Sequence, residues 1–340
     1  MSRSLETVAA LKELEARCAA LSMDEIRERL KPIFAGMWVR SPIFDPGMFV
    51  YRARRVTPTF NTSKPMSLAD LKHPPAELAR QGRANRAGQP MFYCSGMKEP
   101  LFFEIGELNA GDELILSSWK SRSRMLLNNI GYTNLVFQEL GAKRPCPTWE
   151  DLRDGKAAIS VPEGGAELLP SILEVTDNDA LRAELSKLFM KRAEDATLEY
   201  YKLTAAIAEA HLGTVNDTDE FAGILYPSVR MWANGDNIAL TPRYADEHLE
   251  FRRATRVRID KCKANGFDIT YVECAKQVDE AGYLKWLGRL LTWQIPPQTT
   301  AICVATPGRD DDGEYSADKD GSPLYWRVTN SATGKVIEAA

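Results

Sequence analysis

The segment GRANRAGQPMFYCSGMKEPLFFE, residues 82–104, carries the most information about the fold of this chain. Glycine and proline punctuate its first part, which predicts a loop, and residues 91–94 have the pattern of a short buried strand. The run after Gly96 has helical spacing and an apolar face, and it ends at Glu104. The segment therefore predicts a loop, a strand and a helix in one compact unit.

The same segment offers side chains that suit a small ligand. A glycine-rich loop can approach a ligand closely. Arg83, Asn85 and Tyr93 supply a cation, an amide and an aromatic ring, and Glu104 adds a carboxylate. Taken alone, the pattern fits an ordinary turn and a solvated helix acid better than a binding site.

The composition is that of a globular protein. The 340 residues are 44% hydrophobic and 26% charged, which is enough for one large core or two smaller ones. A net charge of −4 argues against nonspecific binding to nucleic acid but is compatible with a small anionic ligand. No apolar run approaches the ~20 residues that cross a bilayer, and the N-terminus does not resemble a leader. We therefore expect a cytoplasmic protein with no membrane partner.

The cysteines and histidines do not predict a metal centre. The six cysteines lack the close pairs of zinc sites and disulfide frameworks, and none of the three histidines lies at ligand spacing. The acidic stretch 308–322 lacks the helix–loop–helix frame and the closing Glu of a calcium loop. We expect no metal and buried thiols, and we expect His211 to be a cation at the C-terminal end of a helix.

Hydrophobic periodicity predicts an α+β fold, with strands separated by helices and long loops. Ser22 and Glu25 make a capping box inside a helical stretch over residues 4–35. The run 200–211 is an amphipathic helix that we expect to pack on a sheet. Further predicted elements are strands at 48–56, 113–119, 221–230 and 235–242, and a helix at 180–192.

These elements divide the chain into three regions. Residues 1–44 form a helical arm, and residues 45–260 form the main domain, with a long insertion at 120–195 that looks irregular over much of its length. Residues 261–340 read as a strand-rich extension that ends in a hairpin.

Several fragments of the main domain occur in an order that resembles a known family. They are YRAR at 51–54, GRANRAGQPMFYCS at 82–95, Glu104, and GILYPSVR with GDNIAL between 223 and 240. Together they resemble the RES domain, a family named for Arg, Glu and Ser. Many of its members are toxins of bacterial toxin–antitoxin pairs that destroy NAD. The resemblance implies a fold related to ADP-ribosyltransferases, with a split β-sheet around an NAD cleft.

Carried over by position, the resemblance makes Arg52 the family Arg, Glu104 the family Glu and Ser228 the family Ser. It implies that these three residues are catalytic and that Tyr93 is the aromatic residue of the pocket. The residues expected to bind NAD are Arg52, Tyr93 and Ser228, with Arg83 and Asn85 as weaker candidates.

These residue types suit cleavage of the bond between nicotinamide and ribose. Loss of the neutral base leaves an oxocarbenium-like sugar, as in glycoside hydrolysis, and a carboxylate such as Glu104 stabilises that charge. The guanidinium of Arg52 would clamp the diphosphate. Tyr93 would stack on nicotinamide or donate a hydrogen bond, and Ser228 would hold the amide or a phosphate.

Three hypotheses about function remain open from the sequence. The first is an enzyme that cleaves NAD by hydrolysis, or by phosphorolysis if phosphate is the acceptor, and so depletes it as a toxin. The second is an ADP-ribosyltransferase that modifies a macromolecule. The third is a non-catalytic binding module. A cognate antitoxin or immunity protein and a homo-oligomer are the macromolecular partners that would fit. The helical arm is a candidate surface for either, but its default interpretation is a lid on the core.

Overall fold

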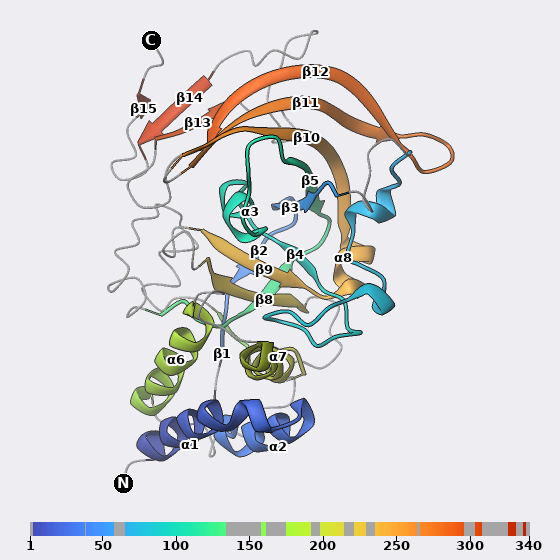
Figure 1. Ribbon diagram of the computed structural model, residues 1–340. Coiled ribbons are helices and arrows are strands. Elements are labelled where there is room, and N and C mark those ends of the chain that lie inside the picture. Colours follow the sequence, from blue (N-terminus) through green and yellow to red (C-terminus); the bar gives the residue numbers. More distant parts are fainter. Residues whose placement is uncertain are drawn as a thin grey trace.

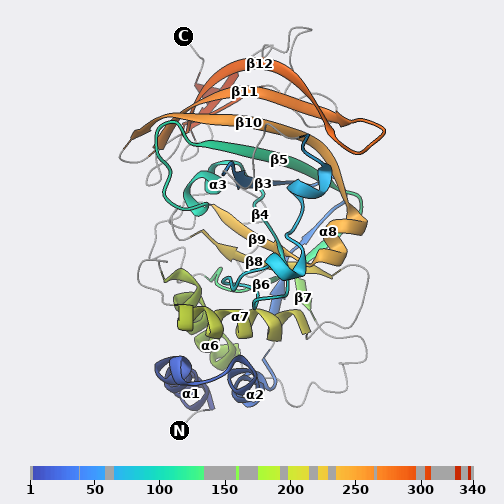
Figure 2. The same cartoon turned by 45° about the vertical axis from the view of Figure 1, so that its right-hand side comes forward.

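The computed structural model has an α+β architecture arranged in layers (Figure 1), as the sequence predicts. A large curved sheet, a small helix, a second sheet and two layers of helices follow one another from the C-terminal to the N-terminal end of the molecule (Figures 1 and 2). The structure describes residues 3–37, 39–57, 65–133, 158–160, 175–191, 198–213, 221–228, 235–263, 266–295, 303–307, 326–330 and 336–337.

The large sheet has five strands in the order β12-β11-β10-β5-β3, and all its neighbours are antiparallel. Its strands are β3 (Phe49–Arg55), β5 (Glu113–Ser121), β10 (Leu249–Lys263), β11 (Gly266–Val278) and β12 (Leu284–Ile295). The domain boundary expected after residue 260 therefore falls inside β10. The strands beyond it continue the same sheet, because β10 hydrogen-bonds to β5 on one side and to β11 on the other.

The second sheet has the order β2-β6-β8-β9-β4, with one parallel pair, β6 and β8. Its strands are β2 (Ile43–Phe44), β6 (Met125–Asn129), β8 (Phe221–Pro227), β9 (Asp236–Leu240) and β4 (Phe92–Cys94). The sequence analysis missed β6, because the run MLLNN is short and does not alternate between apolar and polar residues. Thus the expected insertion at 120–195 supplies an interior strand of this sheet, between β2 and β8.

The two sheets meet where β3 passes β4. Tyr51 N donates to Ser95 O at 2.7 Å, and Ser95 N donates to Tyr51 O at 2.8 Å. Side chains from both sheets fill the space beside this bridge, including Val50 and Trp119 from the large sheet and Phe92 from the second. The sheets are therefore joined by backbone hydrogen bonds as well as by a shared core.

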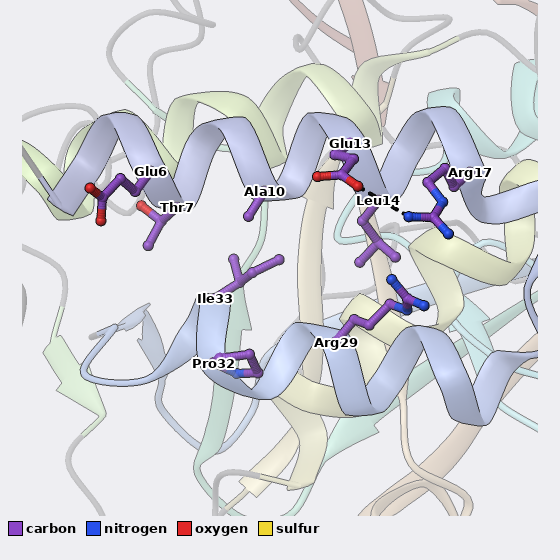
Figure 3. A pocket seen from close by; sticks show the side chains of 9 residues that line it. All are labelled: Glu6, Thr7, Ala10, Glu13, Leu14, Arg17, Arg29, Pro32 and Ile33. Atoms are coloured by element: carbon purple, nitrogen blue, oxygen red, sulfur yellow. Dashed lines mark hydrogen bonds and ion pairs between the residues drawn. The ribbon is translucent and has the colours of Figure 1, made fainter. Parts of the chain in front are cut away.

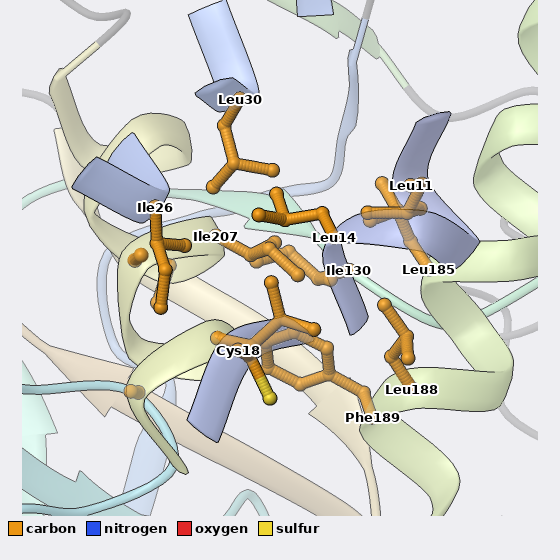
Figure 4. Packing of buried hydrophobic residues seen from close by; sticks show 14 of the residues in the cluster. Leu11, Leu14, Cys18, Ile26, Leu30, Ile130, Leu185, Leu188, Phe189 and Ile207 are labelled. Carbon is orange, nitrogen blue, oxygen red and sulfur yellow. The ribbon is translucent and has the colours of Figure 1, made fainter. Parts of the chain in front are cut away.

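Helices cover the other face of the second sheet. The layer next to the sheet is α6 (Val175–Met190) and α7 (Leu198–Gly213), and the outer layer is α1 (Arg3–Arg17) and α2 (Met23–Phe34) (Figure 1). Their buried side chains interlock in one cluster with strand residues such as Ile224 (Figure 4). This confirms that α7 packs on a sheet, and it makes the N-terminal arm a structural layer of the protein.

The capping box that opens α2 is present. Ser22 Oγ accepts from Glu25 N, and Glu25 Oε2 accepts from Ser22 N at 2.8 Å. Three buried residues of α2, Ile26, Leu30 and Ile33, then face the cluster. A cap of this kind stabilises a helix by about 1 kcal/mol, and the buried stripe fixes its orientation.

The remaining elements are short. They are the helices α3 (Glu99–Glu104) and α8 (Pro242–His248), the 3-10 helices η1 (Cys18–Ala20), η2 (Leu68–Leu71) and η3 (Ala76–Leu78), and the strands β1 (Val39–Ser41), β7 (Ala158–Ser160), β13 (Cys303–Pro307), β14 (Trp326–Asn330) and β15 (Val336–Ile337). The antiparallel pair β14 and β15 confirms the terminal hairpin. The acidic stretch 308–322 lies outside the described residues. No helix in the described ranges is long and apolar enough to span a membrane.

His211 lies in the last turn of α7, but the expectation that it is a cation there is wrong. Its side chain is 2% exposed, and Nδ1 lies 2.8 Å from Ile207 O. Burial lowers the pKa of His211 to about 4, so the ring is neutral at pH 7. Its ring packs edge-on against Phe34 of α2, and it therefore acts as a core residue between two helices.

The depressed pKa of His211 predicts a loss of stability in mild acid. Below pH 6.5 the unfolded state gains a proton on His211 that the folded state gains only near pH 4, so the free energy of unfolding falls as the pH decreases between these values. Between pH 7 and pH 5, the free energy of unfolding measured by urea titration should fall by about 2 kcal/mol more in wild type than in His211→Phe. Equal losses in the two proteins would contradict this assignment.

Candidate functional site

Glu104 and Ser228 lie together although they are distant in sequence. Ser228 Oγ donates to Glu104 Oε1 at 2.5 Å. Ser228 directly follows β8 and is buried, and its backbone N–H donates to Gly235 O at 2.9 Å. A charge-assisted hydrogen bond of this length has a strong, well-defined geometry. The structure thus brings together the two residues expected to carry the family Glu and Ser.

The short helix α3 positions Glu104. Leu101, Phe102 and Phe103 are buried against the large sheet, and the two Phe rings contact the ring of Phe267. Burial of each Phe side chain contributes roughly 2 kcal/mol, which anchors a helix of only six residues. The residue after this apolar run, Glu104, is consequently exposed at the C-terminal end of the helix.

Tyr226 is a buried residue near the end of β8, two residues before Ser228. Burial raises the pKa of Tyr226, and the negative charge of Glu104 raises it further while the positive charge of Arg83 lowers it. Its ring packs edge-on against Phe189 at the end of α6, with centroids 5.6 Å apart. The charges of Arg83 and Glu104 thus act in opposite directions on one buried hydroxyl group.

The glycine-rich loop closes on Tyr93. The Tyr93 hydroxyl donates to Asn85 Oδ1 at 2.7 Å and accepts from Ala84 N at 3.0 Å. The Asn85 amide nitrogen donates to the carbonyls of Arg80 and Arg86, both at 2.8 Å. The polar atoms of the Asn85 side chain therefore shape the loop, and its predicted contact with a ligand is not needed to explain its position.

Arg83 also has internal partners. Its Nη1 donates to Phe189 O at 3.0 Å and its Nη2 to Lys191 O at 2.9 Å, which satisfies carbonyls at the C-terminal end of α6. The guanidinium carbon lies 5.6 Å from the ring centroid of Tyr201 on α7. Arg83 thus joins the loop to both inner helices while remaining on the side of Tyr93 and Tyr226.

Arg52 lies on the other face of β4. Its Nη1 donates to the backbone carbonyl of Tyr93 at 2.8 Å, and its guanidinium carbon lies 5.3 Å from the ring centroid of Phe92. Burial lowers the pKa of Arg52 to about 10, and its buried Nε has no hydrogen-bond partner among the described residues. Within that part of the chain, no hydrogen bond or ion pair links Arg52 to the pair of Glu104 and Ser228.

The sequence analysis missed the role of Asp236. This residue is 2% exposed and opens β9, where its Oδ1 accepts from Ser95 Oγ at 2.7 Å and its Oδ2 from Gly96 N at 2.9 Å. The signal in the sequence is an acid directly before the apolar run of a predicted buried strand, in GDNIAL. Such an acid needs hydrogen-bond donors when it is buried.

A separate groove of about 410 Å³ lies between α1 and α2 (Figure 3). Its lining combines apolar residues such as Leu14 and Ile33 with charged residues, including an exposed ion pair between Glu13 and Arg17. The groove lies in the outermost helical layer, at the opposite end of the molecule from the large sheet (Figures 1 and 3). It therefore does not coincide with the pair of Glu104 and Ser228.

Comparisons with known proteins gave no match. No family model matches the chain, and searches of curated proteins and of solved structures found no similar protein. No group of three or more potential metal ligands occurs among the residues whose placement is described.

The contact between Gly82 and Tyr93 gives a test of the loop geometry. A Cβ atom on Gly82 would lie 2.6 Å from Asn85 Oδ1 and 2.8 Å from the Tyr93 hydroxyl oxygen. We expect Gly82→Ala to lower the free energy of unfolding by about 1–3 kcal/mol through overpacking. In a Tyr93→Phe background the same substitution should lower the free energy of unfolding by less, because the hydroxyl oxygen, one of the two clashing atoms, is absent. An identical cost in both backgrounds would show that the loop does not close on Tyr93.

Proposed function

We propose that this protein cleaves the nicotinamide–ribose bond of NAD. The observation that carries the proposal is the 2.5 Å hydrogen bond between Ser228 Oγ and Glu104 Oε1, which joins two residues that the resemblance to the RES domain singles out from separate motifs. An exposed carboxylate held by a buried hydroxyl is available to a substrate at a fixed position. The fold we propose for this activity is an ADP-ribosyltransferase-like split sheet, which the two sheets joined at Tyr51 and Ser95 support.

Glu104 would supply the main electrostatic stabilisation of the transition state. As the bond to nicotinamide breaks, positive charge develops on the ribose, and a carboxylate close to that charge stabilises the transition state more than the ground state. The hydrogen bond from Ser228 fixes the orientation of the carboxylate before the substrate binds. The same carboxylate can orient a ribose hydroxyl or the incoming nucleophile.

Binding of the dinucleotide requires an aromatic surface and a cation. Tyr93 offers its ring beside the glycine-rich loop, and Arg83 and Arg52 are the two candidate cations for the diphosphate. Arg83 donates to the carbonyl of Phe189, whose ring packs on Tyr226 two residues before Ser228, whereas Arg52 stacks on Phe92 at the other face of β4. We therefore place the diphosphate nearer Arg83, a revision of the role that the resemblance implies for Arg52.

In this proposal the protein is a toxin that depletes NAD, restrained by an antitoxin or immunity protein.

The reaction products distinguish the possible reactions. Free ADP-ribose indicates hydrolysis, and ADP-ribose 1-phosphate formed only when phosphate is added indicates phosphorolysis. Retention of label from NAD on a protein or nucleic acid would instead indicate an ADP-ribosyltransferase.

The role of Glu104 is tested by release of nicotinamide from NAD by the purified protein. Glu104→Gln keeps the shape of the side chain but removes its charge, and we expect kcat to fall by at least about 100-fold. Glu107→Gln is the matched control, because Glu107 is also exposed and lies three residues further along the chain. Its kcat should stay within about twofold of wild type. Undiminished turnover by Glu104→Gln would refute the proposed function.

The position of the diphosphate is tested by NAD binding to two arginine variants. We expect Arg83→Gln to weaken the affinity for NAD by tenfold or more, about 1.4 kcal/mol, because a charge-assisted contact is lost. Arg52→Gln should leave the affinity within about threefold and chiefly lower stability, since it removes the hydrogen bond to Tyr93 O. Titration calorimetry at constant salt measures both affinities. A larger loss of affinity in Arg52→Gln than in Arg83→Gln would indicate that Arg52 binds the diphosphate.

A further inference from the structure

Asp236 lies at the centre of the contacts that place the candidate catalytic pair. On one side, β9 pairs with β8 and Asp236 stands opposite Pro227, the residue before Ser228. On the other side, the carboxylate accepts from Ser95 Oγ and from Gly96 N, in the turn that leads from β4 to α3. One buried side chain therefore contacts the turn that precedes Glu104 and belongs to the strand beside Ser228.

Hydrogen bonds to side-chain oxygens hold the turn at residues 95–97. Ser95 Oγ donates to Asp236 and accepts from Met97 N at 3.1 Å, while the backbone of Ser95 is engaged in the bridge to Tyr51. A Cβ atom on Gly96 would lie 3.0 Å from Asp236 Oδ2, so a larger residue there would crowd the carboxylate. The turn therefore needs a side chain at position 236 with two acceptor oxygens, one for Ser95 Oγ and one for Gly96 N.

We infer that Asp236 is a positioning residue for NAD cleavage, which sets the distance between Glu104 and Ser228; this inference rests on the proposed function. Asp236 acts through the turn at 95–97 and the start of α3, and it does not contact the substrate. Loss of an acceptor at Gly96 N releases the start of the segment that ends at Glu104. A displacement of about 1 Å at a reacting group can lower the rate by roughly 100-fold without removing any catalytic group.

The test compares Asp236→Asn with Asp112→Asn. The substituted amide offers one acceptor and one donor, so it cannot accept from both Ser95 Oγ and Gly96 N. Asp112 is the matched control because it too accepts from a backbone N–H in a turn, that of Asn109 at 2.6 Å, and it lies directly before β5 rather than beside Ser228. Ser95→Ala is a milder second variant that removes one donor and keeps the carboxylate.

Two measurements decide the inference. In steady-state release of nicotinamide, kcat of Asp236→Asn should fall about 10- to 100-fold while KM for NAD changes by less than about threefold, and Ser95→Ala should show a smaller loss of the same kind. In hydrogen exchange, Asp236→Asn should accelerate exchange over residues 95–104, and Asp112→Asn should not. A purely structural effect would lower stability without this split between kcat and KM.

The outcomes separate this inference from the proposed function. If wild type releases no nicotinamide, the proposed function fails, and exchange over 95–104 still decides whether Asp236 holds the segment. If wild type is active and the kcat of Asp236→Asn matches that of Asp112→Asn, the positioning role is overturned while NAD cleavage stands. Unchanged exchange over 95–104 in Asp236→Asn overturns it as well.

Discussion

The bridge between Tyr51 and Ser95 is the contact on which the rest of the structure depends. Two backbone hydrogen bonds connect the edges of the two sheets, and the side chain of Arg52 on β3 adds a third to the Tyr93 carbonyl on β4. Buried backbone groups left without partners would each cost about 1–3 kcal/mol, so the bridge fixes the relative position of β3 and β4. Asp236 extends this constraint from backbone to side chain, because it accepts from the Ser95 hydroxyl. Glu104 ends the helix that follows Ser95 and Gly96, and Ser228 follows the residue that pairs with Asp236, so the network opposes shifts that would separate the two.

The N-terminal helices contribute to the same rigidity from the other side. Arg86 of the glycine-rich loop makes a bidentate ion pair with Glu209 of α7 at 2.5 and 2.6 Å, and its third nitrogen lies 3.2 Å from a carboxylate oxygen of Asp24 on α2. These contacts raise the pKa of Arg86, chiefly through the hydrogen bond to Glu209. The loop that closes on Tyr93 is thus braced by two helical layers. The helical arm, interpreted by default as a lid on the core, packs on the inner helices and supports the loop of the candidate site.

The sequence predicted those elements whose signals are local. The capping box at Ser22, the strand of β3 and the helix α7 follow from patterns within a few residues, and the structure contains them. The strand β6 and the continuation of the large sheet past residue 260 depend on pairing with distant strands, which a single sequence does not encode locally. His211 shows the same limit, since its position in a helix was readable but its burial against Phe34 was not.

In the candidate site, too, local sequence signals identify residues, whereas their contacts depend on distant parts of the chain. Glu104 and Ser228 could be selected from separate motifs, but the hydrogen bond between them requires the turn that Asp236 holds and the strand that ends at Pro227. Arg52 illustrates the converse. Side chains along a strand alternate between faces, so a shift of one residue decides which side of the sheet a charge occupies. Motif order selects Arg52. The register of β3 with β5 and the bridge to Ser95 put its guanidinium against Phe92, on the face of β3 opposite to Tyr51 and α3.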